Sequence, residues 1–295
     1  MRFQGAIIIN NSYNEADINI QHKISRLEEE FKKLDTSIDV IKNNGDIAYI
    51  ENGEIKLNIP SYDFVVYLDK DKYLARLLEK AGMKLFNNAE FLELCDDKML
   101  THIALANMNI PMPKTIPGPL VFKSTNGDDI KVMESVLKQL DFPFLIKGVY
   151  GSLGLNMAYI DSKETFLEEY KKMKAQPLLF QEYIESSRGR SIRCLVIDHK
   201  ILGAFERCNP NDYRSNYHDG ASSKSITLKP QYIELVNKVI KALDIDYAGV
   251  DLLYGEDDKP LLCEINSNAF FQEFEKRTGI NAAKAFAEMI INRIK

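Results

Sequence analysis

The pattern of the chain changes at the proline-rich stretch PMPKTIPGP (residues 111–119), and this change constrains the fold more than any other feature. Up to about residue 90, short β-branched runs alternate with segments whose apolar residues recur at helical spacing, as in residues 20–34. After the prolines, short strand-like runs follow one another with only a few helical segments between them. This order predicts a small α/β unit with a parallel sheet, followed by an α+β region with antiparallel sheets.

Strands and helices of the second region can be placed individually. The expected strands are FPFLIKG (142–148), NMAYID (156–161), PLLFQEYI (177–184), SIRCLVI (191–197) and ILGAFERC (201–208). Helical spacing predicts helices at 163–173, 231–245 and 281–295.

Composition excludes several classes of protein. The net charge of −5 gives no basic surface for nucleic acid, and no apolar stretch approaches the roughly 20 residues of a membrane span. The start, MRFQGAIIIN, is too short and too strand-like for a signal peptide. The four cysteines are scattered, without a C-x-x-C pair. We therefore expect a cytoplasmic protein with reduced thiols rather than disulfides or a zinc site.

A lysine ends the first strand of the second region. Lys147 follows the apolar run 142–146, and a loop with Gly148, Gly151 and Gly154 leads to the next strand. Walker loops and protein kinases place their glycines before the lysine, so neither motif applies. The lysine can still offer a charge to phosphate, and glycines let backbone amides approach the same group. The alternative is a simple hairpin whose lysine extends to solvent.

The stretch AGVDLLYGEDDKPLLCEIN (248–266) predicts a β-hairpin that turns at residues 255–258. Folding it there places Asp251 opposite Glu264, with Asn266 on the same face. Two facing carboxylates repel unless a positive charge lies between them, and by alternation neither neighbouring lysine is on that face. A divalent cation such as Mg²⁺ suits these oxygen ligands. The alternative is a solvated polar face of the hairpin.

Two further stretches carry weaker signals. The sequence QEYI (181–184) ends a buried strand, where backbone groups could meet a purine edge. The irregular polar segment 206–222 carries Arg207, Arg214 and Asn216. Long irregular loops in compact domains are often functional, and arginines suit carboxylate or phosphate recognition. Its alternative interpretation is a surface loop.

Taken in order, these motifs resemble the ATP-grasp superfamily. The similarity is greatest to the RimK-like branch. It is carried by the lysine with its glycine loop, QEYI, the strand with Arg193, RSN (214–216) and the hairpin. This branch contains ribosomal-protein glutamate ligases and related carboxylate–amine ligases. The resemblance covers roughly residues 90–295 and implies two α+β subdomains whose antiparallel sheets clamp ATP. The expected domains are an α/β domain (1–90) and an ATP-grasp domain (91–295), with subdomains 91–184 and 185–295.

The resemblance implies a role for each matching residue. Those expected to hold the phosphates of ATP are Lys98, Lys147, Gly151, Ser152 and Gly154. Those expected at the adenine and the ribose are Gln181, Glu182, Tyr183, Ile184 and Ser191. Those expected near the outer phosphate and the reacting acid are Arg193, Arg207, Arg214 and Asn216. The expected ligands of Mg²⁺ or Mn²⁺ are Asp251, Glu264 and Asn266.

Two positions depart from the family pattern. Many relatives carry a ribose-binding acid where Ser191 stands, and Glu182 or Glu185 could substitute for it. Many relatives also have a Pro-Gly pair after the metal strand, whereas this chain continues as SNAFFQEFE (267–275). In the family that segment borders the substrate carboxylate, so the acid substrate stays open.

The activity that the resemblance implies is an ATP- and Mg²⁺-dependent carboxylate–amine ligase. A carboxylate attacks the γ-phosphate to give an acyl phosphate and ADP, and an amine then displaces phosphate to form an amide. Expected partners are ATP, a carboxylate substrate and an amine acceptor, which is an amino acid, peptide or protein; a homo-oligomer is compatible with the sequence. The residues do not exclude an adenylate-forming route. Two alternatives remain, a ligase that modifies a peptide or protein side chain and a non-catalytic ATP sensor, and the complete metal set argues against the sensor.

Overall fold

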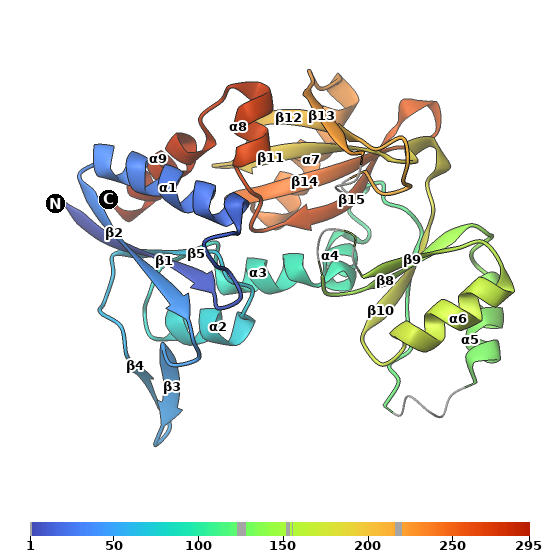
Figure 1. Cartoon of the computed structure of the whole chain (residues 1–295), viewed down its shortest axis with the longest axis horizontal. Coiled ribbons are helices and arrows are strands. Elements are labelled where there is room, and N and C mark those ends of the chain that lie inside the picture. Colours follow the sequence, from blue (N-terminus) through green and yellow to red (C-terminus); the bar gives the residue numbers. More distant parts are fainter. Residues whose placement is uncertain (1, 123–127, 152–153, 155, 216–219) are drawn as a thin grey trace.

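The structure is a computed structural model of the whole chain, and it describes residues 2–122, 128–151, 154, 156–215 and 220–295 (Figure 1). Three main sheets follow one another from the N-terminal to the C-terminal part of the chain. Among the described residues, none of the helices is long and apolar enough to cross a bilayer.

The first sheet is parallel, as predicted. Its strands are β1 (Phe3–Asn10), β2 (Thr36–Asn43), β5 (Phe64–Tyr67) and β6 (Leu85–Phe86), in the order β2-β1-β5-β6. The helices α1 (Ile18–Lys33) and α2 (Lys72–Lys80) connect its strands. The hairpin of β3 (Ala48–Glu51) and β4 (Glu54–Leu57) projects from this unit (Figure 1). Because the strands are parallel, the connections after β1 and β5 leave from the same edge of the sheet.

Two short helices lead out of this unit. They are α3 (Ala89–Asp96) and α4 (Lys98–Leu105). The side chain of Asn88 accepts a hydrogen bond from the Phe91 amide at the start of α3. Asp97 does the same for the Leu100 amide at the start of α4. Each cap satisfies an amide that the first helical turn leaves unpaired, so the chain restarts its helix at residue 97.

The second sheet is antiparallel. It contains β7 (Thr115–Pro117), β8 (Phe144–Gly148), β9 (Met157–Ile160) and β10 (Leu178–Glu182), in the order β7-β10-β8-β9. The helices α5 (Asp129–Leu137) and α6 (Lys163–Met173) cover one face of it (Figure 1). Phe144, Phe166 and Phe180 lie at the centre of this core and are fully buried. Helix α5 was not predicted from the sequence.

The third sheet is also antiparallel. It contains β11 (Arg190–Ile197), β12 (Lys200–Cys208), β13 (Ser222–Ser225), β14 (Tyr247–Tyr254) and β15 (Pro260–Asn266), in the order β13-β12-β11-β14-β15. The helix α7 (Pro230–Leu243) packs against it. The hairpin of β14 and β15 has the predicted register, with Asp251 paired to Glu264. The sequence did not predict β13.

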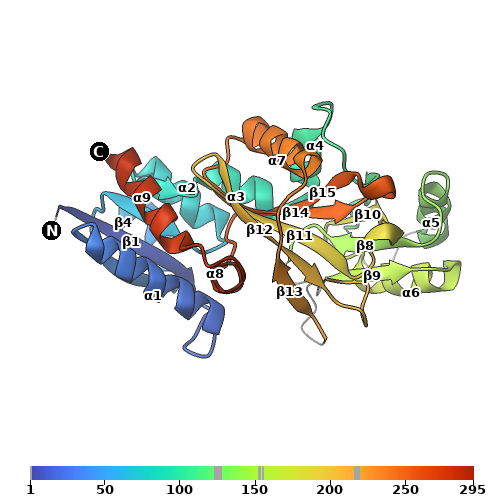
Figure 2. The same ribbon diagram turned by 90° about the horizontal axis from the view of Figure 1, so that it is seen from above.

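Both ends of the chain contribute to one core. After β15 come α8 (Gln272–Thr278) and α9 (Ala282–Ile294), and α9 lies beside α1 (Figure 2). Apolar residues of α9, such as Phe286 and Ile290, share a buried cluster with Ile7 of β1 and Leu27 of α1. The N-terminal sheet is therefore covered by C-terminal helices. The domain boundaries expected at residues 90 and 184 stay predictions.

Candidate active site

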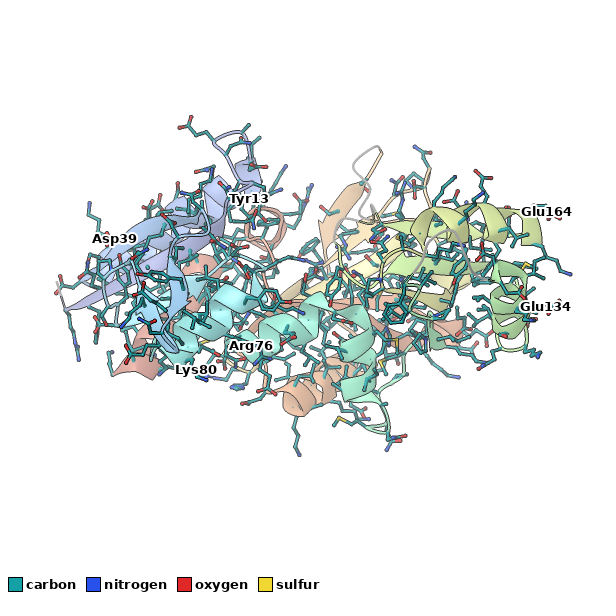
Figure 3. All side chains as sticks on the ribbon, turned by 90° about the horizontal axis from the view of Figure 1, so that it is seen from below. Tyr13, Asp39, Arg76, Lys80, Glu134 and Glu164 are labelled. Atoms are coloured by element: carbon teal, nitrogen blue, oxygen red, sulfur yellow. The ribbon has the colours of Figure 1, made fainter. Side chains whose placement is uncertain are left out.

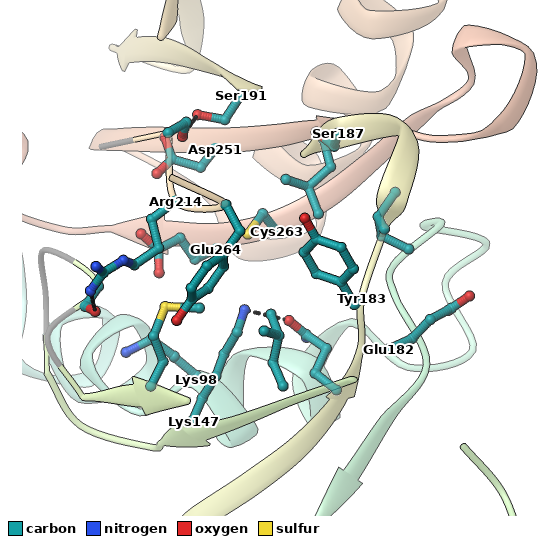
Figure 4. Close-up of a pocket in the computed structure, with 18 of the residues that line it drawn as sticks. Lys98, Lys147, Glu182, Tyr183, Ser187, Ser191, Arg214, Asp251, Cys263 and Glu264 are labelled. Carbon is teal, nitrogen blue, oxygen red and sulfur yellow. Dashed lines mark hydrogen bonds between the residues drawn. The ribbon is translucent and has the colours of Figure 1, made fainter. Parts of the chain in front are cut away.

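A cavity lies between the sheet of β8 and β10 and the sheet of β14 and β15 (Figure 4). Most of the residues singled out in the sequence line this first cavity: Lys98, Lys147, Gly151, Gly154, Gln181, Glu182, Tyr183, Ile184, Ser191, Arg207, Arg214, Asp251 and Glu264. Arg193 and Asn266 line a second cavity, which shares part of its wall with the first. The remaining two, Ser152 and Asn216, lie outside the described residues.

Lys147, near the end of β8, points into the first cavity (Figure 4). Its Nζ donates a hydrogen bond of 2.6 Å to Oε1 of Gln181 on β10. The amide nitrogen of Gln181 donates to Thr115 Oγ1 at 2.9 Å and lies 3.1 Å from Nε2 of His102. Burial, with a smaller effect of Lys147, lowers the pKa of His102 to about 4, so its neutral ring accepts this bond near neutral pH. His102 and Thr115 thereby orient the lysine through Gln181.

Neither His102 nor Thr115 was predicted as a site residue. His102 lies on α4 and Thr115 on β7, so both come close to Gln181 only when the second sheet and the helix before it pack together. Their sequence neighbourhoods carry no motif that points to this role.

A second lysine faces the same cavity. Lys98 begins α4, and its Nζ donates a hydrogen bond of 2.7 Å to the carbonyl of Gly151 in the glycine loop. Burial lowers the pKa of Lys98; the charge of Glu264 raises it, and that of Lys147 lowers it further. Two ammonium groups in one partly buried space repel each other, and an anion between them relieves this repulsion. The pair therefore supports the predicted phosphate site.

Asp251 is buried and compensated by two arginines. Arg193, directly opposite on β11, binds both carboxylate oxygens, with 2.6 Å between its Nη2 and Oδ2. Arg207 of β12 places its Nη2 2.9 Å from the same Oδ2. Burial alone would raise the pKa of Asp251, but Arg193 and then Arg207 lower it to about 2. The sequence argument weighed only the neighbouring lysines as compensating charges of the chain, and the structure adds Arg193 of β11 and Arg207 of β12. The metal site itself stays a prediction.

The residues can nevertheless hold a divalent cation. Glu264 has no ion pair within 4 Å among the described residues, and Asn266 Nδ2 is 3.3 Å from its Oε1. The two arginines use about three of the four lone-pair directions of Asp251, which leaves roughly one for a ligand bond. In the described part of the chain, no group of three or more His, Cys, Asp or Glu side chains is arranged around a metal position. The carboxylate and amide oxygens are hard donors suited to Mg²⁺, with the rest of its coordination left to phosphate and water.

Arg214 connects the two sheets across the first cavity. Its Nη1 donates to the carbonyl of Gly154 in the glycine loop at 3.1 Å. Its Nε and Nη2 bind the carboxylate of Asp212 at 2.9 and 2.8 Å, and these contacts lower the pKa of Asp212. The guanidinium is thus held over the glycine loop, and its place near the outer phosphate stays a prediction.

Part of the wall of the first cavity is apolar and aromatic. Tyr183 and Ile184, which were predicted to meet the adenine, line it together with Met157 and Tyr213. The ring of Tyr213 packs near that of Tyr183, with 6.4 Å between the centroids. Tyr213 was missed although it immediately precedes Arg214, so the arginine motif could have drawn attention to it. Aromatic and aliphatic side chains beside polar, cationic groups suit a nucleotide.

Ser191 lines the first cavity and lies near Asp251 (Figure 4). Its hydroxyl accepts hydrogen bonds from Arg207, at 3.0 Å from Nε and 2.8 Å from Nη2, and is 2.6 Å from the hydroxyl of Ser215. Because the side chain at this position is neutral, Asp251 is the carboxylate partner of Arg207 among the described residues. Contact of Ser191 with a ribose stays a prediction.

The second cavity has a volume of about 490 Å³ and continues from the first toward the N-terminal sheet. The two share five lining residues, which are Lys98, Gly151, Arg207, Cys263 and Glu264. Beyond them, the second cavity is lined by Arg193 and Asn266 and by residues of the connection between β1 and α1. A space of this size next to a phosphate site can hold one or two small substrates.

The sequence profile of the RimK-like ATP-grasp domain matches residues 95–290. The chain belongs to this family. One relative, the uncharacterized protein MG012 of Mycoplasma genitalium, is 30% identical over 264 residues, which cover 88% of this chain and 91% of the relative. The probable alpha-L-glutamate ligase of Legionella pneumophila is 32% identical over 224 residues, covering 75% and 71%.

Solved structures show the same fold. The D-alanine–D-alanine ligase of Bacillus anthracis superposes with a TM-score of 0.75 at 19% identity, covering 99% of this chain and 97% of that one. The predicted ATP-grasp fold is thus confirmed, as is the predicted class of an ATP-dependent ligase that forms carbon–nitrogen bonds. ATP-grasp ligases use ATP and divalent metals in general. The roles of individual site residues stay predictions.

Proposed function

We propose that this RimK-like protein joins a small carboxylic acid to an amine through an acyl phosphate, with an amino acid as one substrate. The observation that supports this most is the shared wall of the two cavities. Lys98, Arg207 and Glu264 border both the first cavity, where the nucleotide would bind, and the second cavity. A terminal phosphoryl group held at this wall would therefore lie next to an acid in the second cavity.

The chain contributes positioning and charge to this reaction. Lys147 and Lys98 would bind the inner phosphates, and Arg214 with the glycine loop would cover the outer one. Glu264, Asn266 and the remaining lone pair of Asp251 would hold Mg²⁺, which supplies neutralisation of the developing phosphate charge when bound. Fixed charges in a site shielded from water stabilise the transition state without reorganisation.

Two bonds are exchanged in sequence. A carboxylate oxygen of the acid attacks the γ-phosphorus, and the bond from that phosphorus to the β–γ bridging oxygen breaks, releasing ADP. The neutral amine nitrogen then attacks the acyl carbon, the carbon–oxygen bond to phosphate breaks, and the ammonium proton passes to phosphate or water. Arg193 and Arg207 adjoin the place where the reacting carboxylate would lie, and they can balance its charge.

The names of relatives indicate the class of substrate. The name of the Legionella pneumophila relative specifies an alpha-L-glutamate ligase, which supports glutamate or a similar amino acid as a substrate here. Addition to a peptide or protein instead of a small molecule is the second candidate, since solved ATP-grasp structures include PsnB in complex with a precursor peptide. The proposal also includes Mg²⁺ as the metal, a cytoplasmic location and compatibility with a homo-oligomer.

The experiment follows the products and the intermediate. Purified protein with ATP and Mg²⁺ is incubated with a panel of carboxylic acids and with hydroxylamine as the acceptor. We expect ADP and phosphate, a hydroxamate of the accepted acid, and transfer of oxygen-18 from the labelled carboxylate into phosphate. Stoichiometric AMP would refute the acyl-phosphate route. Absence of nucleotide turnover with every acid would favour the ATP sensor.

A further inference from the structure

The far end of the second cavity is built by the connection between β1 and α1. Lining residues of this connection and of the first turn of α1 are Tyr13, Ala16, Asp17, Ile18, Asn19 and Ile20. The connection leaves the carboxyl end of a parallel strand, where open α/β sheets commonly bind ligands. Tyr13 lies at the side of the N-terminal unit that faces the middle of the molecule (Figure 3).

The charges that line the second cavity are separated along its length. Arg193 and Arg207 lie near the first cavity, which places positive charge at that end. Among the described residues, the acids that line this cavity are Asp17, Asp96 and Glu264. Asp96 is neutralised by Lys70, with 2.6 Å between Oδ1 and Nζ, and Glu264 is accounted for by the proposed metal site.

Asp17 is the acid that remains. No lysine, arginine or histidine nitrogen within the described ranges lies within 4 Å of its carboxylate. One of its oxygens accepts the amide hydrogen of Asn14 at 2.7 Å, which fixes the carboxylate on the turn before α1. It therefore presents a negative charge at the far end of the cavity without a cation of the chain to balance it.

A second carboxylate lies behind this part of the wall, between Leu68 and Lys70, which line the cavity. Asp69 follows β5 and is fully buried; the side-chain amides of Asn10 and Asn43 donate to it at 2.6 and 2.8 Å. Burial raises the pKa of the Tyr13 phenol, and the nearby charges of Asp17 and then Asp69 raise it further, so the phenol stays protonated near neutral pH. A protonated phenol oxygen and a carboxylate are suitable acceptors for an ammonium group.

We propose that Asp17, with Tyr13, binds a spectator ammonium group of the acid substrate, so that the enzyme selects amino acids over acids that lack the amino group. This inference rests on the proposed function. The reacting carboxylate would lie at the arginine end and the ammonium group at the Asp17 end. The ammonium group held there is not the attacking amine, because the attacking nitrogen must be unprotonated and must lie beside the acyl phosphate at the other end.

The test measures selectivity with paired acids. ADP release is followed with hydroxylamine as the acceptor, using L-glutamate against glutarate, L-aspartate against succinate, and L-alanine against propionate. The variants are Asp17→Asn, which keeps an oxygen for the Asn14 amide, and Tyr13→Phe. Glu15→Gln is the matched control, since Glu15 is an exposed acid on the same turn and does not line the cavity.

For the wild-type enzyme we expect a higher kcat/KM with the amino acid of the accepted pair. Asp17→Asn should lower the ratio of kcat/KM between amino acid and matching acid at least tenfold, through the KM of the amino acid, with the KM of ATP unchanged. Tyr13→Phe should lower it less, and Glu15→Gln should not change it.

Three results would count against the inference in different ways. Equal rates with both members of every pair, or an equal loss for both in Asp17→Asn, would overturn the ammonium site and leave the ligase assignment intact. The same loss in Glu15→Gln would show a general effect of surface charge and would also overturn it. No ADP release with any acid would overturn the proposed activity itself.

Discussion

Removing the charge of either carboxylate of the β14–β15 hairpin should affect the protein in a different way. Asp251 is 2% exposed, and both of its oxygens are bound by arginines, whereas Glu264 has no ion pair among the described side chains. We therefore predict that Asp251→Asn mainly destabilises the fold. Glu264→Gln should mainly abolish metal-dependent turnover.

The loss of folding stability expected for Asp251→Asn can be estimated from the surroundings of this side chain. The arginines lower its pKa from 3.8 to about 2, which corresponds to about 2 kcal/mol of stability at neutral pH. Removing one member of a buried ion pair also leaves the partner charges uncompensated, for a total loss of about 3–5 kcal/mol. Glu264→Gln keeps an oxygen that can accept the Asn266 amide, so its effect on stability should be within about 0.5 kcal/mol.

The assay is unfolding by urea at several pH values, together with thermal shifts in ATP with Mg²⁺ and ATP with EDTA. Because the pKa of Asp251 is lowered in the folded state, its contribution is present above about pH 4 and is lost as the pH falls through about 2. The difference in unfolding free energy between the wild type and Asp251→Asn should therefore become smaller as the pH is lowered. Glu264→Gln should unfold like the wild type and lose the additional stabilisation that Mg²⁺ gives with ATP. An Asp251→Asn protein as stable as the wild type at pH 7 would refute this reasoning.

Three further predictions concern the lysines and His102. Lys147→Met should fold normally and bind ATP about 10- to 100-fold more weakly, in line with about 1.5–3 kcal/mol for a charged hydrogen bond, and unchanged affinity in calorimetry would contradict its phosphate role. Because burial lowers the pKa of His102 from 6.5 to about 4, unfolding stability should fall by up to about 3 kcal/mol as the pH drops across that range, and His102→Gln should flatten this profile in acid titrations followed by fluorescence or circular dichroism. Lys23 is fully buried and its pKa is lowered by burial, while its two acceptors, the Tyr247 hydroxyl and the Ala269 carbonyl, are also hydrogen-bonded to each other. Lys23→Met should therefore keep or raise the Tm, and a clear fall in calorimetry would show that the ammonium group is net stabilising.

Much of the local structure could be predicted from alternation and helical spacing. The hairpin of β14 and β15 is an example, because the side-chain alternation of a strand and the position of its turn specify which residues face each other. Asp251 and Glu264 were placed opposite each other on this basis alone. Helix α5 and strand β13 were not predicted, because both are short and are flanked by stretches of sequence without clear periodicity.

The order of the motifs along the chain was enough to indicate the family and the set of residues around the first cavity. The charge balance inside that set was not predictable. Arg193 compensates Asp251 because β11 lies beside β14, and this neighbour is contributed by a part of the chain 58 residues away. A rule based on residues within one hairpin cannot include such a partner.

The sequence by itself therefore determined the elements, the register of the hairpin and the residues that carry the ATP-grasp pattern, since these depend on local spacing and order. Only the tertiary structure decided which charges neutralise each other and that Tyr13 and Asp17 close the far end of the second cavity. The physical reason is that periodicity is a property of neighbours along the chain. Electrostatic compensation and the walls of a cavity depend instead on which distant segments the burial of apolar surface brings together.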